Sequence, residues 1–201
     1  MLFHRCTAYL PGSIVRTACA LIAAGALATG AAPTTMNLHG MTRAAGRPVA
    51  NAVVWLEAPR APATLSRHAV LDQRNLQFSP RVLVVQVGTT IDFPNDDRVF
   101  HNVFSFRDGK VFDLGMYPVG AVRHITFDKP GLSRIYCNIH PGMAAYVMAV
   151  DSPYFAVSSD AGAFTIPAIE RGTTYHYRAW RAGAADVRGN WIDGDLSIDW
   201  P

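Results

Sequence analysis

The sequence has little cysteine, little charge and no long helical pattern. Of its 201 residues only three are cysteine and 16% are charged, and no helical repeat of apolar residues extends over a long stretch. Val, Ile, Thr and Phe are instead spread along the chain between 13 prolines and 16 glycines. This composition favours an all-β protein, and the length allows one large β domain or two small ones.

Other absences exclude classes of function. No basic block with interleaved aromatic residues is present, so nucleic acid is not an expected partner. The Cys-x-x-Cys-His motif of c-type haem proteins is missing. Beyond the N-terminal segment, no stretch is apolar over the length needed to span a bilayer. We therefore expect no membrane span in the mature chain.

Residues 1–30 are typical of a secretory signal peptide. Arg5 and Arg16 supply positive charge, residues 18–28 form an apolar core that is too short to span a membrane, and small residues lead to Gly30. We predict cleavage near Gly30 and a periplasmic or secreted mature protein. The alternative is an uncleaved amphipathic anchor.

Removal of this segment changes the cysteine count. Cys6 and Cys19 leave with it, so we expect Cys137 to be the only thiol of the mature chain, which then has no internal disulfide. A lone thiol in an oxidising compartment is either well buried or a metal ligand. The net charge falls from +3 to +1 because Arg5 and Arg16 leave, which predicts little electrostatic steering of partners.

Short β-branched and aromatic runs separated by turn residues predict many strands. The runs that we expect to form strands are residues 36–41, 49–57, 82–87, 90–93, 99–106, 121–127, 132–137, 145–150, 154–157, 163–166, 173–180 and 196–200. Asp108-Gly109 predicts a hairpin turn, whereas residues 111–120 show no clear alternation. The pattern predicts Greek-key β sandwiches.

One loop concentrates the chemistry of the chain. In residues 136–143, Cys137, His140 and Met143 lie close together between two predicted strands, and His101 lies upstream on another predicted strand. One cysteine, two histidines and one methionine are the ligand set of a mononuclear blue-copper site, and they suit both Cu(I) and Cu(II). Each of these side chains alone is more often a packed residue than a ligand. Their joint spacing nevertheless favours copper binding.

Residues 70–151 resemble the cupredoxins, and most of all the plastocyanin and amicyanin group. The segments that carry the resemblance are Phe93-Pro-Asn95, His101-Asn-Val103, Phe127-Asp-Lys-Pro-Gly131 and the loop 136–143. The short Cys-x-x-His-x-x-Met spacing of that loop has the amicyanin-like length.

The resemblance implies one type 1 copper ion and a role for each ligand. His101, Cys137 and His140 would be the equatorial ligands and Met143 the axial ligand. His140 would be the partly exposed ligand through which electrons pass. A dinuclear copper site would need two cysteines in the loop, and only Cys137 is present. A second copper site built from the remaining histidines stays open as an alternative.

The residues next to the ligands have expected roles as well. Asn102 would brace the ligand loop with its side chain, and Asn138 would lie beside it. Tyr136, next to Cys137, would offer a second electron route.

An apolar docking rim is expected around His140. We assign Met116, Tyr117 and Pro141 to this rim; the alternative for Met116 and Tyr117 is plain core packing.

The segments on either side resemble two halves of a carboxypeptidase-regulatory-like sandwich. We predict a first half at 35–62, a cupredoxin domain at 67–151, a second half at 152–181 and a C-terminal tail at 182–201. Each half alone has too few strands for a core, so the resemblance implies one sandwich into which the cupredoxin is inserted. A single enlarged cupredoxin is the alternative.

The favoured function is that of a monomeric one-electron carrier, not an enzyme. Its partners would be redox proteins, for example a c-type cytochrome or a periplasmic oxidoreductase. The alternative is a copper-binding or delivery protein, or an accessory binding module of a larger redox system. The closed ligand set and the lack of a Met-rich or His-rich tract favour the carrier.

Overall fold

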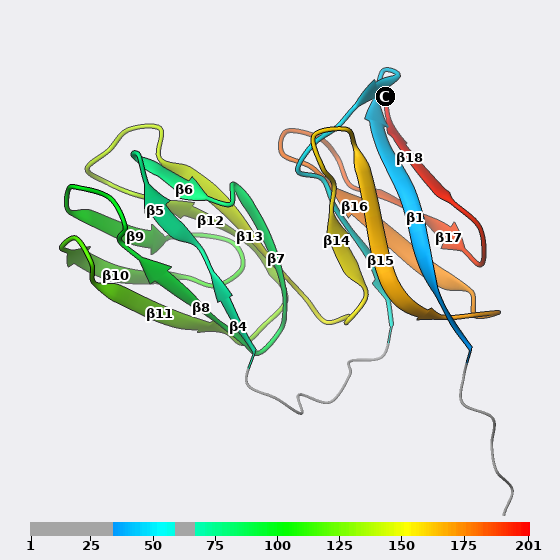
Figure 1. The fold of residues 1–201 in the computed structure, drawn as a ribbon, viewed down its shortest axis with the longest axis horizontal. Helices are drawn as coiled ribbons and strands as arrows, with labels where there is room; N and C mark the ends of the chain where they lie inside the picture. The colour runs from blue at the N-terminus through cyan, green and yellow to red at the C-terminus, as the bar shows by residue number, and fades with distance from the viewer. Residues whose placement is uncertain (1–33, 59–66) are drawn as a thin grey trace, which may run out of the picture. The chain divides into compact units, whose positions relative to one another are not determined.

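Every regular element described in the computed structural model is a β-strand (Figure 1). The structure describes residues 34–58 and 67–201; the predicted signal peptide and the segment from Pro59 to Pro62 lie outside the described residues. The prediction of an all-β fold is therefore confirmed for the described chain. None of its segments forms a helix with the length and apolar character needed to cross a membrane.

The middle of the chain forms the inserted sandwich, which we define as strands β4 to β13. These strands are β4 (His68–Val70), β5 (Asp72–Arg74), β6 (Gln77–Ser79), β7 (Val82–Gln86), β8 (Thr89–Pro94), β9 (His101–Ser105), β10 (Phe112–Tyr117), β11 (Val122–Phe127), β12 (Gly131–Tyr136) and β13 (Ala144–Val150). One sheet has the order β10-β9-β12-β13-β7 and the other the order β11-β8-β4, while β5 and β6 form a separate hairpin. Their apolar faces share one core, which contains Phe93, Val103, Phe127 and Val147.

The two ends of the chain form the flanking sandwich. Its strands are β1 (Thr35–Ala44), β2 (Arg47–Pro48), β3 (Val53–Glu57), β14 (Phe155–Val157), β15 (Ala163–Glu170), β16 (Tyr175–Trp180), β17 (Val187–Trp191) and β18 (Leu196–Trp200). One sheet has the order β15-β1-β18, with β2 paired to β1, and the other the order β14-β3-β16-β17. Strands from before and after the inserted sandwich thus pair directly, as Figure 1 shows for β1 and β15. Residues 182–201 supply β17 and β18 to the same sheets.

Alternating side chains explain why these segments form strands. Leu196, Ile198 and Trp200 of β18 are buried, and the two residues between them are exposed. Ile91 and Phe93 of β8 alternate in the same way with partly exposed residues. Such alternation places one face of each strand against the core and leaves the other face to water.

Strand β10 corrects the expectation that residues 111–120 are irregular. The strand pairs with β9, but its register shifts between Asp113 and Met116, and Gly115 has a φ of +66°. A bulge of this kind inserts an unpaired residue and interrupts the alternation from which strands are recognised.

Strand β15 is longer than predicted. It continues through Pro167 to Glu170, whereas the sequence suggests a loop after Ile166. The strand lies at the edge of its sheet, where proline removes no ladder hydrogen bond that a neighbour needs.

A third cluster of buried apolar residues draws on both sandwiches. Its buried members are Val53, Trp55 and Trp180 of the flanking sandwich and Val82, Met148 and Val150 of the inserted sandwich. The rings of Tyr146 and Trp180 meet edge to face with 5.1 Å between their centroids.

Candidate metal centre

Three side chains from two parts of the inserted sandwich converge on one point. His101 begins β9, Cys137 follows the last residue of β12, and His140 lies in the loop between β12 and β13. The Cys137 Sγ atom lies 3.8 Å from His101 Nδ1 and 3.7 Å from His140 Nδ1. The two Nδ1 atoms are 3.0 Å apart. His101 and Cys137 are buried, and His140 is partly exposed.

The spacing of these donors fits a metal ion. The three separations define a triangle whose centre lies about 2 Å from each corner, which compares with metal–nitrogen bonds of about 2.0–2.1 Å and metal–sulfur bonds of about 2.3 Å at protein zinc sites. A thiolate with two imidazoles suits copper or zinc rather than calcium or magnesium. Cys137 forms no disulfide within the described chain.

The ligand loop is closed by backbone hydrogen bonds. Tyr136 and Ala144 are paired residues at the end of the β12–β13 ladder. Inside the loop the Cys137 N–H donates to the Met143 carbonyl at 3.3 Å, and the Met143 N–H donates to the His140 carbonyl at 3.2 Å. Met143 is buried in the same core cluster as Cys137. The loop therefore holds these residues close together.

Asp97 is a contact of the site that the sequence reasoning missed. Its Oδ2 atom lies 3.0 Å from His101 Nε2, the ring nitrogen that does not face Cys137. The same oxygen accepts a hydrogen bond from the Leu76 N–H at 2.7 Å, and Oδ1 accepts one from the Arg98 N–H at 2.8 Å. The bond from Leu76, with those from Arg98 and His101, lowers the pKa of Asp97 to about 2 against the opposing effect of burial. The sequence signal for this contact was an acidic residue, Asp97, four residues before the predicted ligand His101.

Asn102 links β9, β10 and the ligand loop through its amide group. Its Oδ1 atom accepts a hydrogen bond from the Asn138 N–H at 2.9 Å, and its Nδ2 group donates to Asp113 Oδ1 at 3.2 Å. Asp113 Oδ1 also accepts the Gly115 N–H at 2.8 Å. The bulge of β10 is in this way tied to the residue that follows Cys137.

Tyr136 belongs to an aromatic cluster beside the ligand loop. Its ring centroid lies 5.9 Å from that of Phe104 and 5.6 Å from that of Phe106. Phe106 is exposed, and the Arg107 guanidinium lies 4.7 Å from its ring centroid. The cluster extends from the residue before Cys137 to the protein surface.

Of the residues assigned to the docking rim, two are exposed and one is buried. Met116 is 62% exposed and Pro141 is exposed, as a rim requires. Tyr117 is fully buried, and its hydroxyl donates to the Phe93 carbonyl at 3.0 Å. Burial raises the pKa of Tyr117 to about 12. The assignment of Tyr117 to an exposed rim was therefore wrong, because consecutive residues of β10 point to opposite faces of the strand.

Further exposed apolar residues lie next to a ligand in the sequence or just after β10, and they were not predicted. Phe100 precedes His101, Ile139 precedes His140, and Val119 follows β10. Apolar residues directly before predicted ligands are the sequence signal that would have added Phe100 and Ile139 to the rim.

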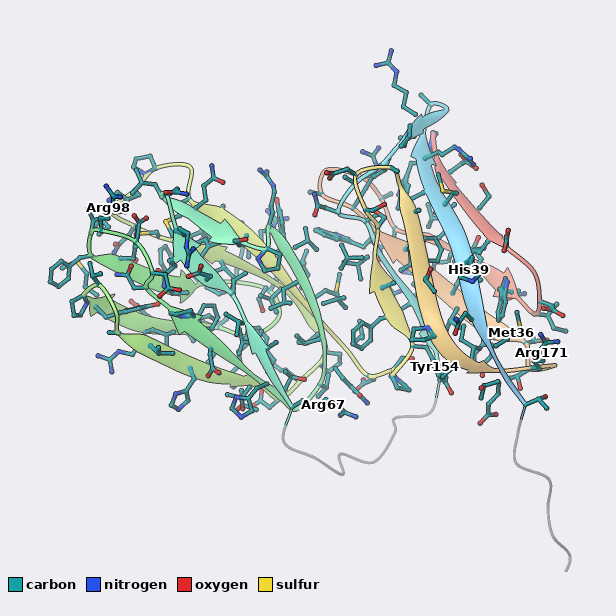
Figure 2. The ribbon with its side chains drawn as sticks, in the orientation of Figure 1. Met36, His39, Arg67, Arg98, Tyr154 and Arg171 are labelled. Atoms are coloured by element: carbon teal, nitrogen blue, oxygen red, sulfur yellow. The ribbon has the colours of Figure 1, made fainter. Side chains whose placement is uncertain are left out.

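The remaining described histidines do not join the candidate site. His39 lies on β1 of the flanking sandwich (Figure 2) and His176 on β16; they contact Thr165 and Asn190. His68 contacts Asp92, and His124 is exposed on β11. In residues 34–58 and 67–201, the only His, Cys, Asp and Glu group with ligand atoms close enough to share an ion is His101, Cys137 and His140.

Among known proteins, similarity to this chain was found only with solved structures. No family model matches the sequence. No curated protein matches it either. A purple cupredoxin from Nitrosopumilus maritimus is 28% identical over 42% of this chain and 100% of its own, with a TM-score of 0.37. A copper-containing nitrite reductase from Thermus scotoductus SA-01 is 26% identical over 47% of this chain and 25% of its own, with a TM-score of 0.41. A reduced amicyanin variant is 25% identical over 50% of this chain and 99% of its own, with a TM-score of 0.39.

Proposed function

We propose that this chain is a type 1 copper protein that carries single electrons between redox proteins in the periplasm. The observation that supports this proposal is the convergence of one thiolate and two imidazole nitrogens on a point about 2 Å from each. A cysteine ligand argues for copper rather than a hard cation, and the buried Met143 adds a thioether to the same loop.

Each ligand has a role in this proposal. His101, Cys137 and His140 would hold copper as equatorial ligands, and Met143 would be the axial ligand. Copper bound in this way supplies one-electron chemistry between Cu(I) and Cu(II). The hydrogen bonds of Asp97, Asn102 and the ligand loop restrain the donors, so a change of oxidation state requires little movement of the chain.

The surface around His140 suits weak docking. His140 is partly exposed, and the exposed apolar residues Phe100 and Ile139 adjoin ligands in the sequence. Met116, which is also exposed, pairs with Asn102 on the neighbouring strand. A small apolar contact of this kind favours short-lived complexes, which an electron carrier needs. The proposed partners are a c-type cytochrome or a periplasmic oxidoreductase, and no substrate is converted at the site.

The test is titration of the purified chain from residue 34 onwards with Cu(II). We expect an intense visible thiolate-to-copper charge-transfer band that saturates at one copper per chain. The band should be lost in Cys137→Ser and strongly altered in His140→Ala. His124→Ala is the matched control, because His124 is exposed on the same sandwich and makes no contact with the site. Copper binding without a visible band in the unaltered chain would sink the proposal.

A further inference from the structure

Both ring nitrogens of His101 have defined neighbours. Nδ1 faces Cys137 and His140, whereas Nε2 faces the Asp97 carboxylate at 3.0 Å. The ring is fully buried, so no water competes for either nitrogen. A neutral imidazole carries one proton, on one nitrogen or the other. A carboxylate can only accept, so its position opposite Nε2 places the proton there and leaves Nδ1 as an acceptor.

Asp97 is itself firmly held. Its side chain is 10% exposed, and the carboxylate accepts backbone N–H bonds from Leu76 and Arg98 in addition to its contact with His101. Leu76 lies in the turn of the β5–β6 hairpin. Arg98, which Figure 2 labels, follows Asp97 in the loop between β8 and β9. Hydrogen bonds from two separate segments thus hold the carboxylate in place, in addition to its contact with the His101 ring.

We propose that Asp97 is a positioning residue of the candidate copper site. Its carboxylate fixes His101 as the Nε2–H tautomer, makes Nδ1 the metal-binding nitrogen, and places a permanent negative charge beside this ligand. The inference rests on the proposed function, because it gives Asp97 a role at the copper site. Carboxylates that accept from a ligating histidine are known to fix its tautomer and raise its basicity.

Two measurable consequences follow from this role. A fixed negative charge near the metal favours Cu(II) over Cu(I), because Cu(II) carries more positive charge, and so lowers the reduction potential. A fixed orientation of the His101 ring also strengthens copper binding. Loss of a carboxylate that orients a ligating histidine typically weakens metal affinity by about 10–100-fold.

The metal-free protein offers a third consequence. The Asp97 carboxylate faces Nε2 of His101 whether or not the site holds a metal. We therefore expect the Nε2–H tautomer at His101 in the absence of metal as well. This expectation does not depend on which metal the site binds.

Two variants separate the charge of Asp97 from its hydrogen bond. In Asp97→Asn the amide oxygen can still accept from Nε2–H, so the tautomer is kept. The charge is lost, and with it the bond from the Arg98 N–H, because the amide NH2 group cannot accept. In Asp97→Ala both are lost, and the buried Nε2–H has no acceptor. Asp96→Asn is the matched control: it removes the same charge one residue away, from an exposed side chain that binds Arg74 at 3.1 Å and not His101.

The experiment measures histidine tautomers by nitrogen-15 NMR in the metal-free chain, then copper affinity and reduction potential in the loaded chain. We expect Asp97→Asn to keep the tautomer and to shift the potential to more positive values than Asp96→Asn does. Asp97→Ala should lose the Nε2–H tautomer and bind copper about 10–100-fold more weakly.

The outcomes that overturn the inference are distinct from those that overturn the proposed function. Equal potential shifts in Asp97→Asn and Asp96→Asn would show that only overall charge matters. An unchanged tautomer and affinity in Asp97→Ala would show that Asp97 does not position the ring. If the unaltered protein gives no thiolate-to-copper band, the proposed function fails, while the metal-free tautomers still decide whether Asp97 sets the state of His101.

Discussion

The two sandwiches of this chain share an architecture but differ in the polar groups that they bury. The buried polar residues of the inserted sandwich are Gln73, Gln86, Thr89, Asn95, His101, Asn102, Ser105 and Ser133. Thr42, Ser152 and Ser158 are those of the flanking segments. Burying a polar group costs free energy unless it is hydrogen-bonded, so the larger set requires a reason beyond folding.

Residues of both sets bond to backbone carbonyls, as Thr89 and Asn95 do in the inserted sandwich, and His101 and Asn102 differ from them. Thr42 and Ser158 bond to backbone carbonyls, for example that of Val49, and hold the chain in its turns. In the inserted sandwich His101 and Asn102 bond to the side chains of Asp97 and Asp113, next to the ligand loop. The comparison teaches that buried side-chain networks mark the candidate site, whereas isolated side-chain-to-backbone bonds mark structure.

The largest expected effect comes from removing the flanking sandwich altogether. A fragment of residues 67–151 should fold and show the copper charge-transfer band, because its core and its ligands lie within it. It should melt at a lower temperature than the whole chain, because Val82, Met148 and Val150 lose the cover of Trp55 and Trp180. Circular dichroism and copper titration check both statements. A fragment that does not fold would favour a single enlarged domain over an inserted one.

Next in size is a core truncation in the flanking sandwich. Ile198 is buried in β18, so Ile198→Ala should lower the free energy of unfolding by about 2–5 kcal/mol. The copper spectrum should stay the same, because Ile198 belongs to the flanking core. Chemical denaturation with and without copper measures both. A shifted copper band would contradict the separation of roles between the sandwiches.

Acid should weaken the metal-free inserted sandwich through Asp97. Its pKa of about 2 lies below the value of about 3.9 for an unfolded chain, so the ionised carboxylate stabilises the fold above pH 4. This contribution is lost as the pH falls from 4 through 2 and is on the order of 2 kcal/mol. Unfolding free energies at pH 6 and pH 2.5 should therefore differ by more in the unaltered protein than in Asp97→Asn. Equal differences in the two proteins would show that Asp97 does not contribute to the loss of stability in acid.

The smallest effects come from single buried hydrogen bonds. Ser158→Ala should cost about 1–2 kcal/mol, because it leaves the buried Ala52 N–H without its acceptor. Asn102→Ala should cost a similar amount, because it removes two bonds, from the Asn138 N–H and to Asp113. Only Asn102→Ala should change the copper band, since Asn102 holds the residue after Cys137. The two variants therefore match in stability and differ in spectrum. A spectral change in Ser158→Ala would break the comparison between the sandwiches.

Sequence alone predicted the features that repeat or cluster along the chain. Residues 145–150 were predicted as a strand from their apolar residues, and the structure bears this out in β13, whose last four residues are buried. Cys137, His140 and Met143 were found together because they share one loop, and His101 because it lies on a predicted strand next to Asn102. These signals are local, so no knowledge of the fold was needed to see them.

The features that were missed depend on contacts between distant segments. Asp97 is one acidic residue in a polar loop, and its role follows only from the position of its carboxylate beside the His101 ring. Tyr117 was misplaced because the bulge in β10 hides the alternation that would have put Met116 and Tyr117 on opposite faces. Within the tail, residues 196–200 were predicted as a strand but β17 was not, and the tail's place in the flanking sandwich follows only from the pairing of β17 with β16 and of β18 with β1.

The most direct test of the central claim is a spectroelectrochemical titration of the copper-loaded chain. The account predicts that the visible charge-transfer band bleaches and returns reversibly, with one electron taken up per chain. Cys137→Ser should show neither the band nor this reversible electron. A loaded protein that takes up no electron reversibly, or that keeps its electron uptake when Cys137 is replaced, would contradict the account.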